Sequence, residues 1–384
     1  MGCVVSSQKR VKMDFIPVSS PSLREEDAAA VASAIRQGWI SSEGPQVQEF
    51  EREFADLIGV EHAVAVANGT AALDIAVESL GIAAGDEVIL PSFTIISCLG
   101  QILRAGATPI FVDSLRDTWN LDPQQVRNAI TPRTKAIIGV HIYGLPADID
   151  EIVAIGNEHG IPVIEDAAEG HGQHLNAKPL GSWGKISTFS FYSNKLITTG
   201  EGGMLLTDDV ELANKARQLR NLSFNSEQRF VHHSIGWNYR ITSMQAALGL
   251  SQLKRLDTLL EQKKEIGRHY QDLLGSLEDI SLPMNSYRGS ENVYWVFGIV
   301  LPEDSPLTAK AVMEKLSQKG IGTRPFFYPL HRQPVLSAFK LENQEALPVS
   351  EWLGNKGFYL PSGSDSTTEK REYVARELKR ALSS

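Results

Sequence analysis

Up to about residue 250, short apolar runs alternate with helix-like segments, and this order constrains the fold more than any other feature. The runs are almost continuously apolar, which is typical of strands that are covered on both faces of a sheet. We predict strands at residues 63–67, 87–90, 109–112, 136–140, 162–164 and 188–191. Helix-like segments between them include residues 71–80, 148–158 and 210–220. The repeated order predicts an α/β fold with a mostly parallel central sheet.

The length of the chain and its C-terminal pattern indicate a second, smaller domain. A chain of 384 residues is long for a single core. Residues 243–270 have the pattern of one long connecting helix, and the pattern then predicts a strand at 293–301 and a helix at 309–319. We therefore predict a leader of residues 1–14, a large domain of residues 15–255, and a small C-terminal α+β domain of residues 256–384.

The composition excludes several classes of protein. A net charge of -9 without a Lys/Arg cluster disfavours a nucleic-acid partner. Only Cys3 and Cys98 are present, which excludes a disulfide framework or an iron–sulfur site and fits the cytoplasm. No apolar stretch approaches the roughly 18 residues that span a bilayer, so we expect no membrane segment. Met1-Gly2-Cys3 fits a loose lipidation pattern, but a frayed leader is the simpler interpretation.

The segment that follows the first predicted strand could bind an anion. In parallel sheets, ligands bind beyond the carboxyl ends of the strands. Asn68-Gly69-Thr70 lies at such an end, where a helix begins. The free N–H groups of a helix N-terminus attract anions, and glycine lets a phosphate approach the backbone. On its own the segment also fits an ordinary capped helix.

Two later strand ends carry acids and a lysine. Glu165 and Asp166, with Glu169 beyond them, directly follow a strongly apolar strand, where a carboxylate is costly to bury without a partner. Ser190 lies in the next strand, and Lys195 follows that strand in a loop rich in Ser, Thr and Gly. Burial can lower the pKa of such a lysine and free its amine as a nucleophile. Each feature alone also fits solvated surface residues.

Together the three segments supply the protein groups that an enzyme using pyridoxal phosphate (PLP) needs. These groups are a phosphate cradle, an acid and a lysine. The lysine would bind the cofactor covalently, and the aspartate would keep its pyridine nitrogen protonated.

At this point the sequence resembles the DegT/DnrJ/EryC1/StrS sugar aminotransferases of PLP fold type I, from about residue 15 to the end. Several motifs occur in the right order, which is more specific than any one of them. They are Gly38-Trp39-Ile40-Ser41-Ser42, Asn68-Gly69-Thr70, Gly85-Asp86-Glu87-Val88, residues 165–169, Asn194-Lys195, residues 198–203, Asn238-Tyr239-Arg240 and Arg324-Pro325.

The resemblance implies an enzyme that moves an amino group from L-glutamate to a nucleotide-linked 4-keto-6-deoxy sugar. It also implies a homodimer with shared active sites. Lys195 and Asp166 would be catalytic. The cofactor-binding set would be Asn68, Gly69, Thr70, Ile95, Asp166, Glu169, Ser190, Lys195 and, from the other subunit, Asn238. The sugar would be approached by Arg324, Tyr328 and His331. Ile95 is a departure, because many relatives carry an aromatic residue there that stacks on the cofactor ring.

Three alternatives stay open. The same fold could act at C3 of a keto-sugar or on a cyclic polyol ketone, and a non-catalytic regulatory homologue could keep the fold. A metal enzyme could use Glu165, Asp166, His171 and His174. Zinc sites usually have a tighter ligand set, so we predict no metal.

Overall fold

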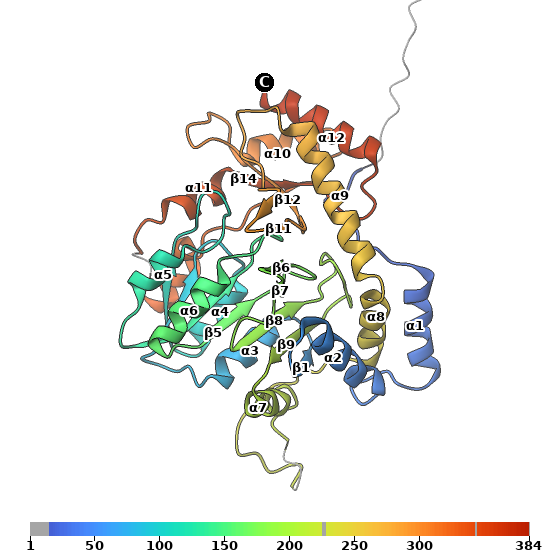
Figure 1. Ribbon diagram of the computed structural model, residues 1–384, viewed down its shortest axis with the longest axis vertical. Helices are drawn as coiled ribbons and strands as arrows, with labels where there is room; N and C mark the ends of the chain where they lie inside the picture. The colour runs from blue at the N-terminus through green and yellow to red at the C-terminus, as the bar shows by residue number, and fades with distance from the viewer. Residues whose placement is uncertain (1–14, 225–227, 342–343, 384) are drawn as a thin grey trace, which may run out of the picture.

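A seven-stranded sheet forms the centre of the protein (Figure 1). The computed structural model describes residues 15–224, 228–341 and 344–383. The strand order is β1-β9-β8-β5-β4-β2-β3, and every neighbouring pair is parallel except the two pairs that β9 makes. The strands are β1 (His62–Val66), β2 (Glu87–Pro91), β3 (Thr108–Val112), β4 (Thr134–Val140), β5 (Val163–Asp166), β8 (Ile186–Ser190) and β9 (Gly203–Thr207). The mostly parallel sheet is confirmed, and the antiparallel strand β9 is an addition that the sequence pattern did not reveal.

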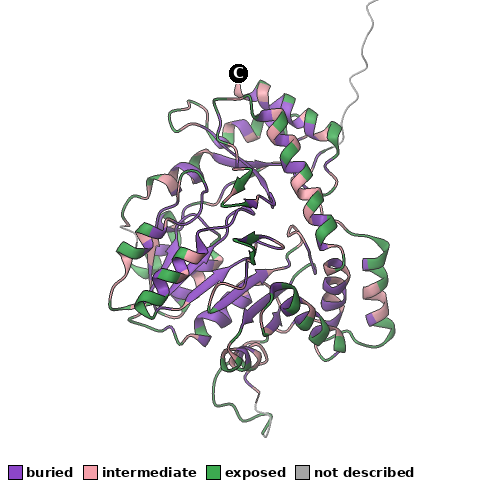
Figure 2. Cartoon of the chain, viewed as in Figure 1, coloured by how far each residue is buried: buried purple, intermediate pink, exposed green. Residues whose placement is uncertain are grey.

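Helices cover both faces of this sheet, which explains why its strands are apolar on both sides. One face packs on α3 (Gly69–Ser79), α4 (Ser97–Arg104) and α7 (Val210–Arg220). The other face packs on α2 (Pro45–Ile58), α5 (Pro123–Ala129) and α6 (Ile149–His159). Figure 2 shows the strands of the central sheet largely buried, whereas the helices expose their outer sides.

The single long helix predicted over residues 243–270 is wrong, because the chain forms two helices there. They are α8 (Ser243–Leu253) and α9 (Leu256–Leu274). Arg255 leaves the helical conformation with φ -115, and its guanidinium donates to Asp27 Oδ2 at 2.8 Å and to the Ser22 carbonyl at 2.9 Å. Asp27 lies in α1 (Glu25–Arg36), which packs against α8. Within the described ranges, no helix combines the length and apolarity needed to cross a membrane.

The C-terminal part builds a second, smaller sheet and core. In this antiparallel sheet, β14 (Gly357–Leu360) lies between β12 (Phe297–Val300) and β13 (Arg324–Pro325). The sheet packs with α9, α10 (Ala309–Ser317) and α12 (Thr368–Leu382), and Ile16 joins the same core. The domain boundary at residue 255 stays a prediction, and the predicted leader of residues 1–14 lies outside the described residues.

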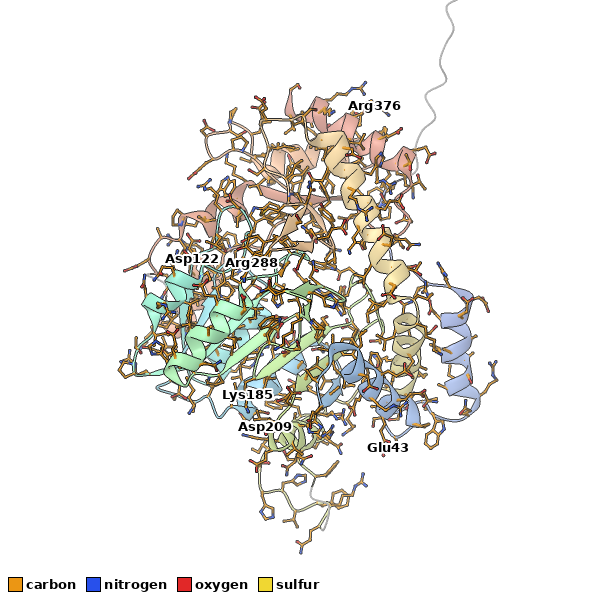
Figure 3. All side chains as sticks on the ribbon, in the orientation of Figure 1. Glu43, Asp122, Lys185, Asp209, Arg288 and Arg376 are labelled. Atoms are coloured by element: carbon orange, nitrogen blue, oxygen red, sulfur yellow. The ribbon has the colours of Figure 1, made fainter. Side chains whose placement is uncertain are left out.

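Short elements tie the two parts together. The hairpin of β10 (Ser286–Tyr287) and β11 (Ser290–Glu291) carries Arg288, which lies above α6 (Figure 3). Arg288 donates to Asp148 at 2.8 Å and to Asp150 at 2.6 Å, at the start of α6. The remaining elements are β6 (His174–Leu175), β7 (Lys178–Pro179), η1 (Leu330–Arg332), η2 (Pro334–Phe339) and α11 (Pro348–Lys356).

Candidate active site

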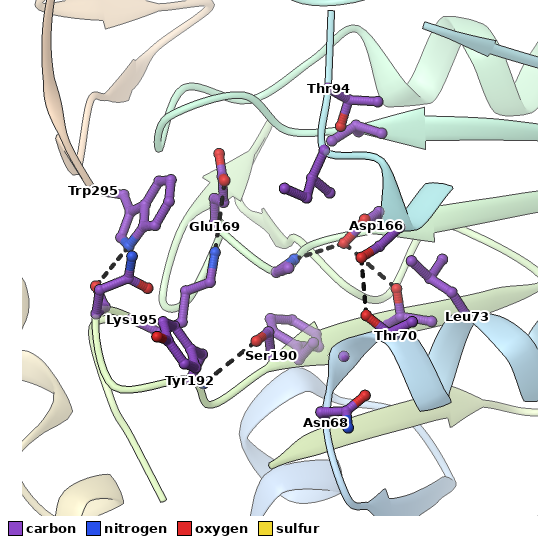
Figure 4. A pocket seen from close by; sticks show the side chains of 18 of the residues that line it. Asn68, Thr70, Leu73, Thr94, Asp166, Glu169, Ser190, Tyr192, Lys195 and Trp295 are labelled. Atoms are coloured by element: carbon purple, nitrogen blue, oxygen red, sulfur yellow. Dashed lines mark hydrogen bonds and ion pairs between the residues drawn. The ribbon is translucent and has the colours of Figure 1, made fainter. Parts of the chain in front are cut away.

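A cavity of about 680 Å³ opens where β5 and β8 end and α3 begins. Its position is the one that parallel sheets favour for ligands. Figure 4 shows that the side chains of Asp166 and Lys195 reach this cavity from different segments. The residues around it are Asn68, Gly69, Thr70, Ala71, Leu73, Thr94, Ile95, Ser97, Val140, Asp166, Ala168, Glu169, Thr188, Phe189, Ser190, Tyr192, Asn194, Lys195, Glu201, Tyr239, Trp295, Arg324, Phe327 and Tyr359.

One end of the cavity is an anion cradle at the N-terminus of α3. Asn68 caps the helix, since its side chain accepts from the Ala71 N–H at 2.8 Å. The first turn therefore presents its remaining N–H groups and the positive end of the helix dipole to the cavity. A Cβ on Gly69 would lie 2.9 Å from the Ser190 Cβ, so glycine is required for this close approach. The Thr70 hydroxyl lies 2.9 Å from the Ser97 hydroxyl, which adds polar groups to the cradle.

Asp166 lies in the floor of the cavity with few donors. Its Oδ1 accepts from the Ala168 N–H at 3.0 Å, and its Oδ2 accepts from the thiol of Cys98 at 3.3 Å. Burial raises the pKa of Asp166 above its usual value, although these hydrogen bonds and the charge of Lys195 oppose the rise. A cation that entered the cavity could therefore pair with a buried carboxylate that has few hydrogen-bond donors of its own.

Lys195 extends from the loop after β8, and its amine is directed at Glu169 (Figure 4). Its Nζ lies 3.6 Å from Glu169 Oε1, and the two side chains are 10% and 8% exposed. Burial lowers the pKa of Lys195, while Glu169 and Asp166 act in the opposite direction. Burial also raises the pKa of Glu169 to about 7, against the effects of Lys195 and the Tyr143 N–H. Both shifts favour the neutral form of the amine, which is the form that takes up a proton.

The structure separates the other predicted site residues into two groups. Ile95 and Arg324 line the cavity, while Tyr328 and His331 do not. Asn238 is exposed on the segment between α7 and α8.

His331 is buried elsewhere, in a hydrogen-bonded chain. Its Nδ1 lies 2.6 Å from the Ser92 hydroxyl, and its Nε2 lies 3.0 Å from Glu351. His331 therefore links Ser92, directly after β2, to α11, and its predicted contact with the sugar stays a prediction.

Sequence reasoning missed several residues of the cavity wall. Trp295 and Tyr359 come from the C-terminal part, and Tyr239 comes from the segment before α8. The sequence predicts one strand over residues 293–301, but β12 begins only at Phe297, so Trp295 lies before it. Cys98, beneath Asp166, was counted only as one of two cysteines, and nothing local marks its role.

The four residues of the metal alternative do not converge. Successive residues of a strand point to opposite faces, so Glu165 and Asp166 diverge. His171 packs against Phe189, with ring centroids 5.2 Å apart. Among the described residues, no group of three or more His, Cys, Asp or Glu is arranged to hold a metal ion.

The donor set of the cavity fits PLP, the cofactor that the resemblance implies. The cradle at α3 matches a phosphate group, and the under-bonded Asp166 matches a protonated ring nitrogen. The buried amine of Lys195 matches an aldehyde that forms a Schiff base. Ile95 is 42% exposed in the cavity wall, where it can cover a ring without aromatic stacking.

Comparisons with known proteins agree with this fit. The profile of the DegT/DnrJ/EryC1/StrS aminotransferase family matches residues 21–379. A GDP-perosamine synthase of Escherichia coli O157:H7 is 38% identical over 371 residues, which cover 95% of this chain and 98% of that protein. A putative pyridoxal phosphate-dependent aminotransferase, EpsN of Bacillus subtilis, is 35% identical over 94% of this chain and 95% of its own length. The crystal structure of DesI in the presence of its TDP-sugar product is 31% identical, with a TM-score of 0.88 over 96% of this chain and 93% of that one.

Proposed function

The chain belongs to the DegT/DnrJ/EryC1/StrS aminotransferase family, and on this basis we propose that it transfers an amino group from L-glutamate to a nucleotide-linked 4-keto-6-deoxy sugar. It is a PLP-dependent enzyme of fold type I. One observation carries the proposal: the Lys195 amine, the Asp166 carboxylate and the N-terminus of α3 share one cavity. The likeness to GDP-perosamine synthase supports the 4-keto acceptor.

Each of these groups has a distinct task. When bound, PLP supplies a ring that accepts the electron pair released beside the substrate nitrogen. Asp166 would hold the ring nitrogen protonated, and the first turn of α3 would bind the phosphate. The Nζ of Lys195 would take and return the proton, with the buried carboxylate of Glu169 paired to it at 3.6 Å. An aminotransferase alternates donor and acceptor in one site, so ping-pong kinetics are expected.

We extend the proposal to a homodimer with shared active sites. The segment between α7 and α8 projects from the sheet below α7 (Figure 1). It carries exposed apolar side chains, with Phe230 79% and Ile235 91% exposed, and the exposed Asn238. Exposed apolar groups of this size favour contact with another chain. Light scattering should give twice the chain mass of 42.2 kDa, and Asn238→Ala should weaken PLP binding. A cytoplasmic location stays a prediction.

The first experiment is a visible spectrum of the purified protein with PLP, before and after L-glutamate. We expect a band of the lysine-bound cofactor that bleaches with glutamate. Lys195→Ala should lose the band and at least about 10⁴-fold of the activity, because it removes both the covalent link and the proton carrier. Lys185→Ala is the matched control, since Lys185 is a surface lysine that pairs with Asp209 at 2.8 Å.

The acceptor is then identified by product mass. GDP- and TDP-linked 4-keto-6-deoxy sugars, a 3-keto analogue and a cyclic polyol ketone are each incubated with the loaded enzyme and glutamate. Conversion of a 4-keto sugar to the amine supports the proposal. Conversion of only the 3-keto sugar or the polyol ketone would replace the acceptor, and the absence of any PLP band would favour the non-catalytic homologue.

A further inference from the structure

Trp295 brings a flat aromatic face against the amine of Lys195. The Nζ lies 3.7 Å from the ring centroid of Trp295. A cation at this distance is attracted by the negative face of an indole, more strongly where water is excluded. Trp295 is 8% exposed, so the contact is largely desolvated. Figure 4 shows the indole on one side of the amine and Glu169 at its end.

The indole also anchors the loop that carries the lysine. Trp295 Nε1 donates to the carbonyl of Asn194 at 2.9 Å, directly before Lys195. One side chain of the C-terminal part therefore contacts both the amine and the backbone of the lysine segment.

The backbone around Trp295 is held in place by specific contacts. Tyr294 adopts φ 46, and its N–H donates to Asn292 Oδ1 at 2.7 Å. The Val293 N–H donates to the carbonyl of Gly144 at 3.3 Å. Gly144 has φ 97, and a Cβ there would lie 2.8 Å from the Trp295 N, so only glycine fits. These constraints fix the indole against the lysine rather than leaving it as a mobile wall residue.

We propose that Trp295 is a positioning residue that holds the free amine of Lys195 beside Glu169 whenever that amine is not bonded to the cofactor. The amine needs such a restraint, because Lys195 and Trp295 also line a second cavity of about 40 Å³, which α9 lines as well. By holding the amine in the main cavity, the indole keeps it where a proton must be taken and returned.

The electrostatic surroundings of the amine define the test. A cation over an indole stabilises the charged amine, so removing the ring must lower the pKa of Lys195 further. Glu169 and Asp166 act on the same amine, and they are unchanged by a substitution at Trp295. Further titratable groups line the two cavities with Lys195. They are Tyr192, Glu201, Tyr239, Arg324 and Tyr359 in the main cavity and Lys263 in the second, and the charge of Lys195 also acts on His171.

The experiment measures the pKa of the Lys195 amine directly in the full chain without cofactor. Brief acetic anhydride labelling at a series of pH values is followed by mass spectrometry of the Lys195 peptide, with the exposed Lys185 peptide as reference. We expect Trp295→Leu to lower this pKa by about half a unit to one and a half units. This inference rests on the proposed role of Lys195, but the labelling needs no amino transfer, so its failure is separate from a failure of the proposed function.

Trp352→Leu is the matched control. Trp352 is 6% exposed, donates from Nε1 to the Leu301 carbonyl at 2.9 Å, and carries the guanidinium of Arg116 4.4 Å from its ring centroid. Trp352 therefore makes the same two kinds of contact as Trp295, a hydrogen bond to a carbonyl and a cation over the ring, but with other partners than Asn194 and Lys195. This variant should leave the pKa of Lys195 unchanged.

Fluorinated tryptophans give a second measurement that leaves the packing intact. Fluorine withdraws electron density from the ring face at nearly constant shape, so the pKa of Lys195 should fall stepwise with the number of fluorines. An unchanged pKa across the fluorinated series, or in a folded Trp295→Leu variant, would overturn the positioning role.

Discussion

Glu165 and Asp166 are neighbours at the end of β5, and both are buried, with exposures of 0% and 3%. They nevertheless project from opposite faces of the sheet. Glu165 accepts hydrogen bonds from the imidazole of His141, the N–H groups of residues 181, 183 and 184, and the Ser187 hydroxyl. Asp166 accepts one backbone N–H at 3.0 Å, a thiol at 3.3 Å and a distant hydroxyl at 3.5 Å.

This difference in donors gives two buried carboxylates opposite pKa shifts. Burial alone raises the pKa of both. For Glu165, the hydrogen bonds from His141, Gly181 and Gly184 outweigh burial and hold the pKa below its usual value. For Asp166, the donors are too few, and the pKa stays raised. A satisfied carboxylate stabilises the fold, whereas an under-bonded one is available to a ligand.

Of the two substitutions at the end of β5, Asp166→Asn should give the larger loss of activity, without a loss of stability. An amide cannot hold a ring nitrogen protonated, so we expect kcat to fall by about 10²- to 10⁴-fold. The melting temperature of the cofactor-free chain should not fall, because the substitution removes a poorly compensated buried charge. Steady-state kinetics and calorimetry on the same preparation measure both. A collapse of stability with Asp166→Asn would remove the distinction between the two faces.

Glu165→Gln should show the reverse pattern. The neutral amide lacks the negative charge to which His141 and the backbone N–H groups donate. Its NH₂ group would also face these donors instead of accepting from them. Breaking a buried, hydrogen-bonded charge of this kind costs about 3–5 kcal/mol in the free energy of unfolding. Denaturant unfolding measures it, while kcat per folded molecule should change little. A large fall in kcat with unchanged stability would show that Glu165 belongs to the active site.

The pH dependence of that stability loss sharpens the comparison. The pKa of Glu165 is lowered in the folded state, so its contribution is present above its usual value of 4.5 and is lost as the pH falls through the folded pKa. The difference between wild type and Glu165→Gln should therefore be greatest near neutral pH and shrink in acid. The pKa of Asp166 is raised, so its burial opposes folding above its usual value of 3.8. Asp166→Asn should gain stability near neutral pH and lose that gain in acid.

The sequence predicts the position of Asp166 better than it predicts the hydrogen-bond donors of Glu165. Apolar runs that end in polar residues predict β5 and place Asp166 at a ligand-binding edge, because strand patterns are local. The donors of Glu165 lie 16 to 24 residues away along the chain, and no local pattern announces them. The link between Ser92 and His331 spans 239 residues, so no local pattern predicts it, and the assignment of His331 to the sugar rests on the resemblance alone. β9 was missed because its Gly203 extends the preceding glycine-rich loop.

Cys98 gives the smallest predicted effect and the finest test of why Asp166 differs from Glu165. Its thiol is the donor to Asp166 Oδ2, and burial raises the pKa of that thiol, so it stays protonated and can donate. Cys98→Ala removes the donor and should raise the pKa of Asp166 further. The ionised carboxylate, which would pair with the cofactor ring, then becomes less favourable. The loss corresponds to about 1 kcal/mol, or about a fivefold rise in the Kd for PLP. Cys98→Ser keeps a donor and should bind PLP at least as well as wild type. Equal Kd values of the Ala and Ser variants for PLP would mean that the thiol only fills space. The raised pKa of Asp166 would then come from the scarcity of donors alone.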